Sequence, residues 1–229
     1  MALIFPKWTN EIPKIAPPVL GVLGAFATFV VWFWWSPKHT DVGYAPVQPV
    51  PYSHKLHAGN LGMDCRYCHT YAEQGPHAGV PPTQTCMNCH TQVKTDSPKL
   101  APVRKSWEDG SAIPWKRIHK IADYAYFNHS VHLNIDGGKY AVGCTSCHGR
   151  IDQMVVVRQQ EPLSMGWCLE CHRDVRNAED RGSNPGERIR PRSEITNMVW
   201  EPSADWSQTA LEVSKRLKPP TVECSGCHR

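Results

Sequence analysis

The chain contains little material for an ordinary hydrophobic core. Hydrophobic residues make up only 41% of its 229 residues, and 20 residues are proline, which interrupts helices and sheets. A domain of this length normally depends on a larger apolar interior. We therefore expect something besides side-chain packing to hold much of the chain together.

The chain also lacks any cysteine outside one motif. Its ten cysteines form five Cys-x-x-Cys pairs, and a histidine directly follows each pair. Disulfides in a secreted protein, or zinc ligation, would account for the paired cysteines but not for the histidines. The repeated pattern is typical of covalent c-type haem attachment. The five motifs are Cys65/Cys68/His69, Cys86/Cys89/His90, Cys144/Cys147/His148, Cys168/Cys171/His172 and Cys224/Cys227/His228.

The spacing within each motif suits this chemistry. Two thiols can bond the two vinyl groups on one porphyrin edge, while the adjacent imidazole reaches the iron from one face. The sequence therefore predicts five c-type haems that carry electrons, with no catalytic residue of the chain's own. The predicted proximal iron ligands are His69, His90, His148, His172 and His228.

The haems also predict the fold class. Each haem is a large apolar plate held by two thioethers and its iron, so it replaces missing core and staples the chain. We expect a multihaem cytochrome c, mostly coil with short α-helices, with one N-terminal transmembrane helix and little or no sheet.

Charged residues are absent from Ile15 to Trp35, a stretch that ends in four bulky aromatic residues at 32–35. This pattern predicts an uncleaved transmembrane anchor with an aromatic belt. A cleavable signal peptide is the alternative, but it would need small residues where the tryptophans stand. Haem attachment occurs outside the bacterial cytoplasm. We therefore predict a single pass through the inner (cytoplasmic) membrane, with the haem domain on the periplasmic, extracytoplasmic side.

The formal net charge of +4 does not indicate a nucleic-acid partner. Each six-coordinate haem with ionised propionates adds roughly −1 when ferric and roughly −2 when ferrous, so the complete protein is near neutral or mildly acidic. We expect a membrane and other redox proteins as partners, and no nucleic acid.

Two segments of the chain repeat one pattern. Tyr52-Ser-His54-Lys-Leu-His57 precedes the first two motifs, and Phe127-Asn-His129-Ser-Val-His132 precedes the next two. Such internal similarity predicts two modules of two haems each. The predicted organisation is a cytoplasmic N-terminus (1–14), an anchor helix (15–36), a Pro-rich tether (37–51), a first dihaem module (52–115), a second dihaem module (116–172) and an extended C-terminal segment with the fifth haem (173–229).

The repeated histidines are candidates for the second, distal iron ligands. Histidines at i and i+3 lie side by side on a helix, so they cannot clamp opposite faces of one iron. Each pair is therefore predicted to serve two different haems, the alternative being surface histidines that merely follow an aromatic residue. The distal candidates are His54, His57, His119, His129 and His132, with Met154 and Met198 as competitors that would raise a haem's potential.

These elements together resemble the pentahaem cytochrome subunit of bacterial alternative complex III. The resemblance rests on the run from Val42 to His57, on Trp115-Lys-Arg-Ile-His119 and on Ser164-Met-Gly-Trp-Cys168, together with the haem motifs. It covers residues 37–172 closely. The haem modules alone are shared with small multihaem cytochromes of the c7 kind.

The resemblance implies a subunit of a membrane quinol:electron-acceptor oxidoreductase, in a respiratory or photosynthetic chain. In that family an iron-sulfur subunit supplies electrons, a polytopic subunit binds quinol, and a monohaem cytochrome c or soluble periplasmic acceptor receives electrons. The alternative is a stand-alone membrane-anchored multihaem quinol dehydrogenase, which would oxidise quinol without partners.

Overall fold

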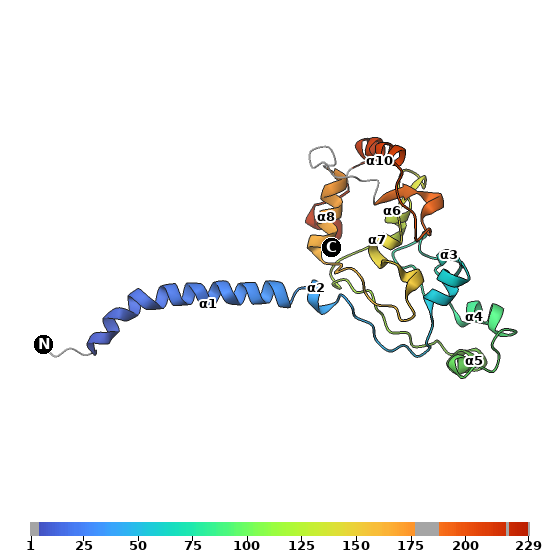
Figure 1. Cartoon of the computed structure of the whole chain (residues 1–229), viewed down its shortest axis with the longest axis horizontal. Helices are drawn as coiled ribbons and strands as arrows, with labels where there is room; N and C mark the ends of the chain where they lie inside the picture. Colours follow the sequence, from blue (N-terminus) through green and yellow to red (C-terminus); the bar gives the residue numbers. More distant parts are fainter. Residues whose placement is uncertain (1–4, 177–187, 219, 229) are drawn as a thin grey trace.

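A long N-terminal helix projects from a body of short helices and loops (Figure 1). The computed structural model describes residues 5–176, 188–218 and 220–228. Helix α1 (Ile12–Trp34) follows the 3₁₀ turn η1 (Lys7–Glu11), and Pro13 in its first turn needs no hydrogen-bond partner. Within the span Lys7–Trp34, an 18-residue window has a mean hydropathy of 1.9 and is not buried in the body. By length and composition, it could cross a membrane.

The body is built from helices of only one to four turns. The helices that carry Cys-x-x-Cys motifs place both cysteines three residues apart on one face. These helices are α3 (Cys65–Cys68), α4 (Thr83–His90), α7 (Thr145–His148), α8 (Met165–Arg176) and α11 (Cys224–Cys227). The other short elements are α2 (Pro37–Thr40), the π-helical turn η2 (Lys55–Asn60), η3 (Pro98–Leu100), α5 (Ala101–Asp109), α6 (His129–Leu133), η4 (Ile151–Gln153), η6 (Arg192–Glu194) and α10 (Ala204–Arg216).

One small antiparallel sheet ties the second module to the C-terminal segment. Strand β1 (Tyr140–Val142) pairs with β2 (Ile189–Pro191), with Ala141 opposite Arg190. This agrees with the expected scarcity of sheet.

The apolar core is small and divided. One cluster contains Val50, Met87 and Val103, and a second contains Leu133, Ala141 and Ile195. The accessible surface is 15490 Å², whereas a compact monomer of this mass exposes roughly 10,500 Å². Side-chain packing thus leaves much of this chain exposed, in α1 and in the body.

The C-terminal segment differs from the extended one predicted for residues 173–229. Helix α10 runs for 13 residues, capped by the Ser203 side chain, which accepts a hydrogen bond from the Trp206 amide. It forms because Ala210 and Val213, one turn apart, are buried against the body. Residues 177–187 of the segment lie outside the described residues.

The Pro-rich tether also contacts the body. It opens with the single turn α2, and Val50 near its end is buried in the first core cluster. The Gln48 side chain accepts a hydrogen bond from the Lys116 amide and donates one to the Lys116 carbonyl, both 2.9 Å.

Candidate metal centre

Three histidine pairs have the separation that one shared iron requires. The ring centroids lie 6.5 Å apart for His54 and His69, 6.3 Å for His57 and His90, and 6.1 Å for His132 and His172. Two imidazoles on opposite sides of a metal ion, each bonded at ~2 Å, have centroids ~6 Å apart. In each pair, one partner is a motif histidine and the other belongs to a repeated turn.

A second feature orients most of these rings. In seven histidines, Nδ1 lies 2.6–2.9 Å from a backbone carbonyl, to which its N–H can donate. Such a bond selects the tautomer whose other nitrogen, Nε2, is free to bind a metal. The seven are His57, His69, His90, His129, His132, His172 and His228. By contrast, His54 Nδ1 is buried without a hydrogen-bond partner among the described residues.

The two repeated turns share one geometry. The Tyr52 ring lies 4.8 Å from His54 and 4.5 Å from His57, edge-on to the first and stacked on the second. Phe127 makes the same contacts, at 4.8 Å with His129 and 4.6 Å with His132. One aromatic ring therefore sets the angle between two imidazoles in each module.

The environment keeps several of these imidazoles uncharged. Burial, followed by the nearby His69, lowers the pKa of His54 to about 4, and burial also lowers the pKa of His132. A metal binds only the neutral imidazole. Both rings are thus in the protonation state that iron ligation needs near neutral pH.

The third motif is arranged differently. His119 Nε2 lies 3.2 Å from His148 Nδ1, and the two ring centroids are 4.3 Å apart. That spacing is too short for an iron between the rings, which needs ~6 Å. Burial, then His119 and His129, lower the pKa of His148 to about 3. By analogy with His54, which faces His69, the repeat pattern predicts His129 as the partner of His148.

His119 and the methionines remain candidates for the fifth iron. Met154 is buried beside the first histidine turn, where its carbonyl accepts a hydrogen bond from the Lys55 amide at 3.0 Å. Met198 is partly buried and follows Asn197, whose carbonyl binds Arg190. His228 is oriented by the Tyr124 carbonyl at 2.9 Å. A second ligand for His228 stays a prediction.

Sequence reasoning missed the residues that hold these rings. The carbonyls of Gly79, Val93, Thr221 and Tyr124 accept from motif histidines. Every residue has a carbonyl, so no residue type marks these positions.

Arg190 was also missed, although it lies against the third motif. It is only 4% exposed and donates to Thr145 Oγ1 within the motif. Only its approach to Gly143 leaves a trace in the sequence, since a Cβ at that glycine would overlap the guanidinium.

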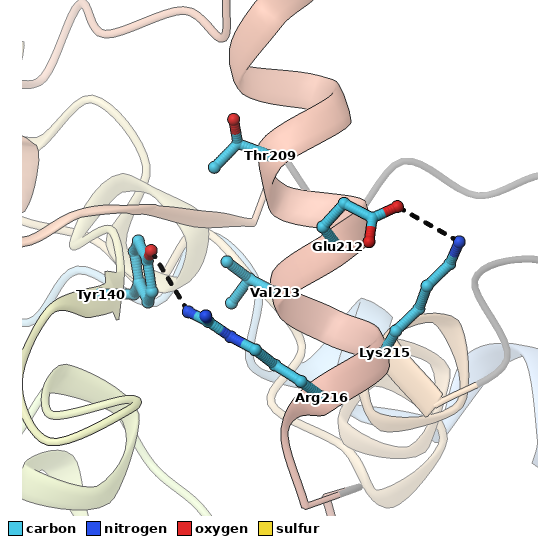
Figure 2. Close-up of a pocket in the computed structure, with 6 residues that line it drawn as sticks. All are labelled: Tyr140, Thr209, Glu212, Val213, Lys215 and Arg216. Atoms are coloured by element: carbon cyan, nitrogen blue, oxygen red, sulfur yellow. Dashed lines mark hydrogen bonds and ion pairs between the residues drawn. The ribbon is translucent and has the colours of Figure 1, made fainter.

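A separate shallow pocket of about 400 Å³ lies between α10 and Tyr140 (Figure 2). Arg216 crosses it, 3.5 Å from the Tyr140 hydroxyl and 2.9 Å from Asp136. No cysteine, histidine or methionine lines it, so it is distinct from the paired imidazoles. Within the described residues, no cluster of three or more His, Cys, Asp or Glu side chains could hold a metal ion by itself.

The chain is similar to one curated protein whose name describes its cofactor. That protein is the multiheme cytochrome c subunit of menaquinone reductase from Nitratidesulfovibrio vulgaris. The two are 27% identical over 188 residues, which cover 81% of this chain and 78% of that protein. No protein-family model matches the chain. With this relative, the short helices, the scarce sheet and the long apolar helix confirm the predicted fold class of a multihaem cytochrome c.

Proposed function

We propose that this chain is the haem-carrying electron-transfer subunit of a membrane-bound quinone oxidoreductase complex. The observation that carries the proposal is the set of three imidazole pairs, each with ring centroids 6.1–6.5 Å apart. Each pair joins a Cys-x-x-Cys-His motif to a histidine from a repeated turn. When bound, c-type haem supplies a one-electron couple at its iron, and bis-imidazole ligation keeps that iron low-spin and closed to substrates.

The residues present fit haem in three ways. All ten cysteines are free thiols, as covalent attachment requires. The motif histidines have Nδ1 bonded to carbonyls at four of the five sites, which leaves Nε2 for iron. Large apolar side chains beside the histidine turns and the fourth motif are exposed, including Leu56 at 48%, Val131 at 64% and Met165 at 69%. A porphyrin face would cover such side chains.

The finer assignment is the pentahaem subunit of alternative complex III. The proposed partners are an iron-sulfur subunit that supplies electrons, a polytopic quinol-binding subunit and a monohaem cytochrome c. α1 anchors the chain in the inner membrane, with the haem body on the periplasmic side. The relative's name, a menaquinone reductase subunit, supports a quinone-linked complex.

Two measurements on the mature protein test the cofactor content. Intact mass and haem quantification should give five covalent haems per chain and no disulfide, and fewer than five adducts would contradict this stoichiometry. Near-infrared charge-transfer bands of the oxidised protein should show bis-histidine ligation, with any His/Met haem visible as a separate band.

Single variants test the ligands. His57→Ala and His132→Ala should each change the iron of one haem from low-spin to high-spin, while all five haems stay attached. Replacing His54 and His57 should affect two different haems. If both variants alter the same haem, or neither alters any, the ligand assignment is wrong.

Purification separates the two functional readings. The proposed subunit should fractionate with membranes, keep its N-terminus and co-purify with partner subunits. It should not oxidise quinol alone. Quinol oxidation by the isolated subunit would instead identify the stand-alone quinol dehydrogenase.

A further inference from the structure

Cysteines from different haem motifs lie together in the folded chain. We number the motifs in chain order as site 1 (65–69), site 2 (86–90), site 3 (144–148), site 4 (168–172) and site 5 (224–228). Each cysteine attaches a porphyrin at its rim. Neighbouring cysteines of two sites therefore bring two porphyrin rims together.

Sites 1 and 2 are joined through the first histidine turn. The Tyr52 ring contacts both His54, which faces site 1, and His57, which faces site 2. The Asn88 amide in α4 donates to the Tyr67 hydroxyl in α3 at 3.1 Å.

Sites 1 and 3 meet although they belong to different modules. Cys144 packs on the same core cluster as Ala72, which follows site 1. Thr196, whose segment carries Ile195 over that cluster, donates to Asp64 beside site 1 at 2.9 Å. The Cys65 and Cys144 thiols are neighbours at this junction, so that the pKa of Cys65 is lowered and that of Cys144 is raised.

Cys65 and Cys144 hold the same position in the two repeats, as the first cysteine of the first motif. A contact between equivalent positions is the mark of a two-fold arrangement. The segments that support the histidine turns obey the same relation. Gly75, after site 1, accepts from Ser130 in α6, and Met154, after site 3, accepts from Lys55 in η2.

The line continues from site 3 through site 4 to site 5. The Phe127 ring contacts both His129, which the repeat assigns to site 3, and His132, whose ring centroid lies 6.1 Å from that of His172 in site 4. His172 of site 4 bonds the Thr221 carbonyl at 2.6 Å, just before site 5.

Sites 2 and 5, at the two ends of this line, carry the most exposed cysteines. Cys89 of site 2 and Cys224 of site 5 are exposed, whereas the other eight cysteines are partly buried. In Figure 1, α4 with site 2 lies at the end of the body farthest from α1, and α8 with site 4 lies on the side nearest α1.

We propose that the haem sites form one line in the order 2, 1, 3, 4, 5, so that electrons enter and leave this subunit at sites 2 and 5. The inference rests on the proposed function, because it requires haem at each motif. It differs from the chain order in one testable respect. Site 1 is internal with two neighbours, and site 2 is terminal with one.

Electron paramagnetic resonance of the oxidised holoprotein distinguishes these orders. His54→Ala and His57→Ala change adjacent ligands on one turn, so each serves as the other's matched control. Each should remove one of the low-spin signals and create a high-spin iron, which speeds the spin relaxation of its neighbours. We expect His54→Ala to speed the relaxation of two remaining signals, and His57→Ala that of only one. His77→Ala, in an exposed loop, should leave every signal unchanged.

The outcomes separate the order from the function. If His57→Ala relaxes two signals and His54→Ala only one, the sites follow chain order and the inference is overturned, while the ligand assignment stands. If neither variant removes a low-spin signal, the ligand assignment fails and the order fails with it. If the alanine variants do not accumulate, His54→Met and His57→Met can replace them in the test. The altered haem is then reduced first, and its neighbours are identified by shifts in their midpoint potentials.

Discussion

The two histidine turns present their imidazoles alike but are held in place differently. The aromatic ring lies at matching distances from both histidines in each turn, within about 0.1 Å. Yet the first turn is the π-helical η2, and the second is the α-helix α6 with an Asn128 cap. Ligand geometry is therefore shared, while the backbone that delivers it is not.

The difference lies in what each turn packs against. η2 lies against η4, so closely that Gly59 has no room for a Cβ beside the Asp152 carbonyl. α6 is held by Arg192 at the Leu133 carbonyl, and the C-terminal segment adds Arg190 against the third motif. The first turn depends on backbone contact with the other module. The second also depends on Arg192 from the C-terminal segment, and the third motif beside it depends on the buried Arg190.

The largest loss of stability is expected from Arg190→Lys, which affects the second module. Arg190 donates to Thr145 Oγ1 and to the Asn197 carbonyl, each at 3.1 Å, and lies 4.7 Å over the Trp200 ring. Lysine cannot make the forked contacts, so the acceptors on Thr145 and Asn197 lose a hydrogen-bond donor. We expect a loss of about 3 kcal/mol in unfolding free energy. Denaturant unfolding followed by circular dichroism measures it.

Arg150→Lys is the matched control. Arg150 also makes a forked contact, with Asp152 at 2.9 and 2.8 Å, but its side chain is exposed, so lysine keeps the ion pair and water replaces the lost contact. Its cost should stay below about 0.5 kcal/mol. Equal costs for the two variants would show that burial of Arg190 contributes nothing to the second module.

Gly59→Ala should weaken the first turn by about 2 kcal/mol, because the added methyl group overlaps backbone that cannot easily move. Both ligands on that turn should shift, so the absorption of two haems should broaden together. Gly75→Ala, where a Cβ meets no atom within 4 Å, should cost less than about 0.5 kcal/mol. A harmless Gly59→Ala would contradict the close packing of η2 on η4.

Asp64 makes the cap of α3 dependent on pH, unlike the neutral Asn128 cap of α6. Its hydrogen bonds to Arg66 lower the pKa of Asp64 to about 2, whereas an unfolded Asp titrates near ~3.9. Between these values the unfolded chain binds more protons, so this stabilisation is complete above the higher pKa and is lost as pH falls through the lower.

Asp64→Asn tests this dependence. The stability difference between wild type and Asp64→Asn should shrink as pH falls from 5 to 2, as measured by urea unfolding at each pH. An unchanged difference across that range would show that the Asp64 carboxylate contributes nothing through its charge.

The smallest effect is expected from replacing Tyr52 by phenylalanine, the residue type at the equivalent position 127 of the second turn. Tyr52→Phe keeps the ring contacts with both imidazoles. The Tyr52 hydroxyl is uncharged at neutral pH, because burial raises its pKa, so its removal takes no charge away. The change in unfolding free energy should stay below about 1 kcal/mol, with unchanged haem spectra. Tyr52→Leu removes the ring and should alter the spectra of both haems on that turn.

Local patterns explain what could be predicted. The Cys-x-x-Cys-His motifs, the histidine repeat and the apolar run each lie within a few residues, so the printed sequence displays them whole. The structure places His54, His57 and His132 opposite motif histidines, and iron ligation by these pairs stays a prediction. The expected extended C-terminal segment missed α10, because its helix depends on burying Ala210 and Val213 against distant residues.

The sequence by itself therefore determined the fold class and the number of motifs, because both follow from short-range residue patterns. Only the tertiary structure decided which histidine faces which motif and that Cys65 meets Cys144. It also decided which carbonyls orient the imidazoles. Apart from the local carbonyl contacts of His57, His90 and His132, these contacts join residues 10 to more than 100 positions apart, and they arise from packing that no local pattern encodes.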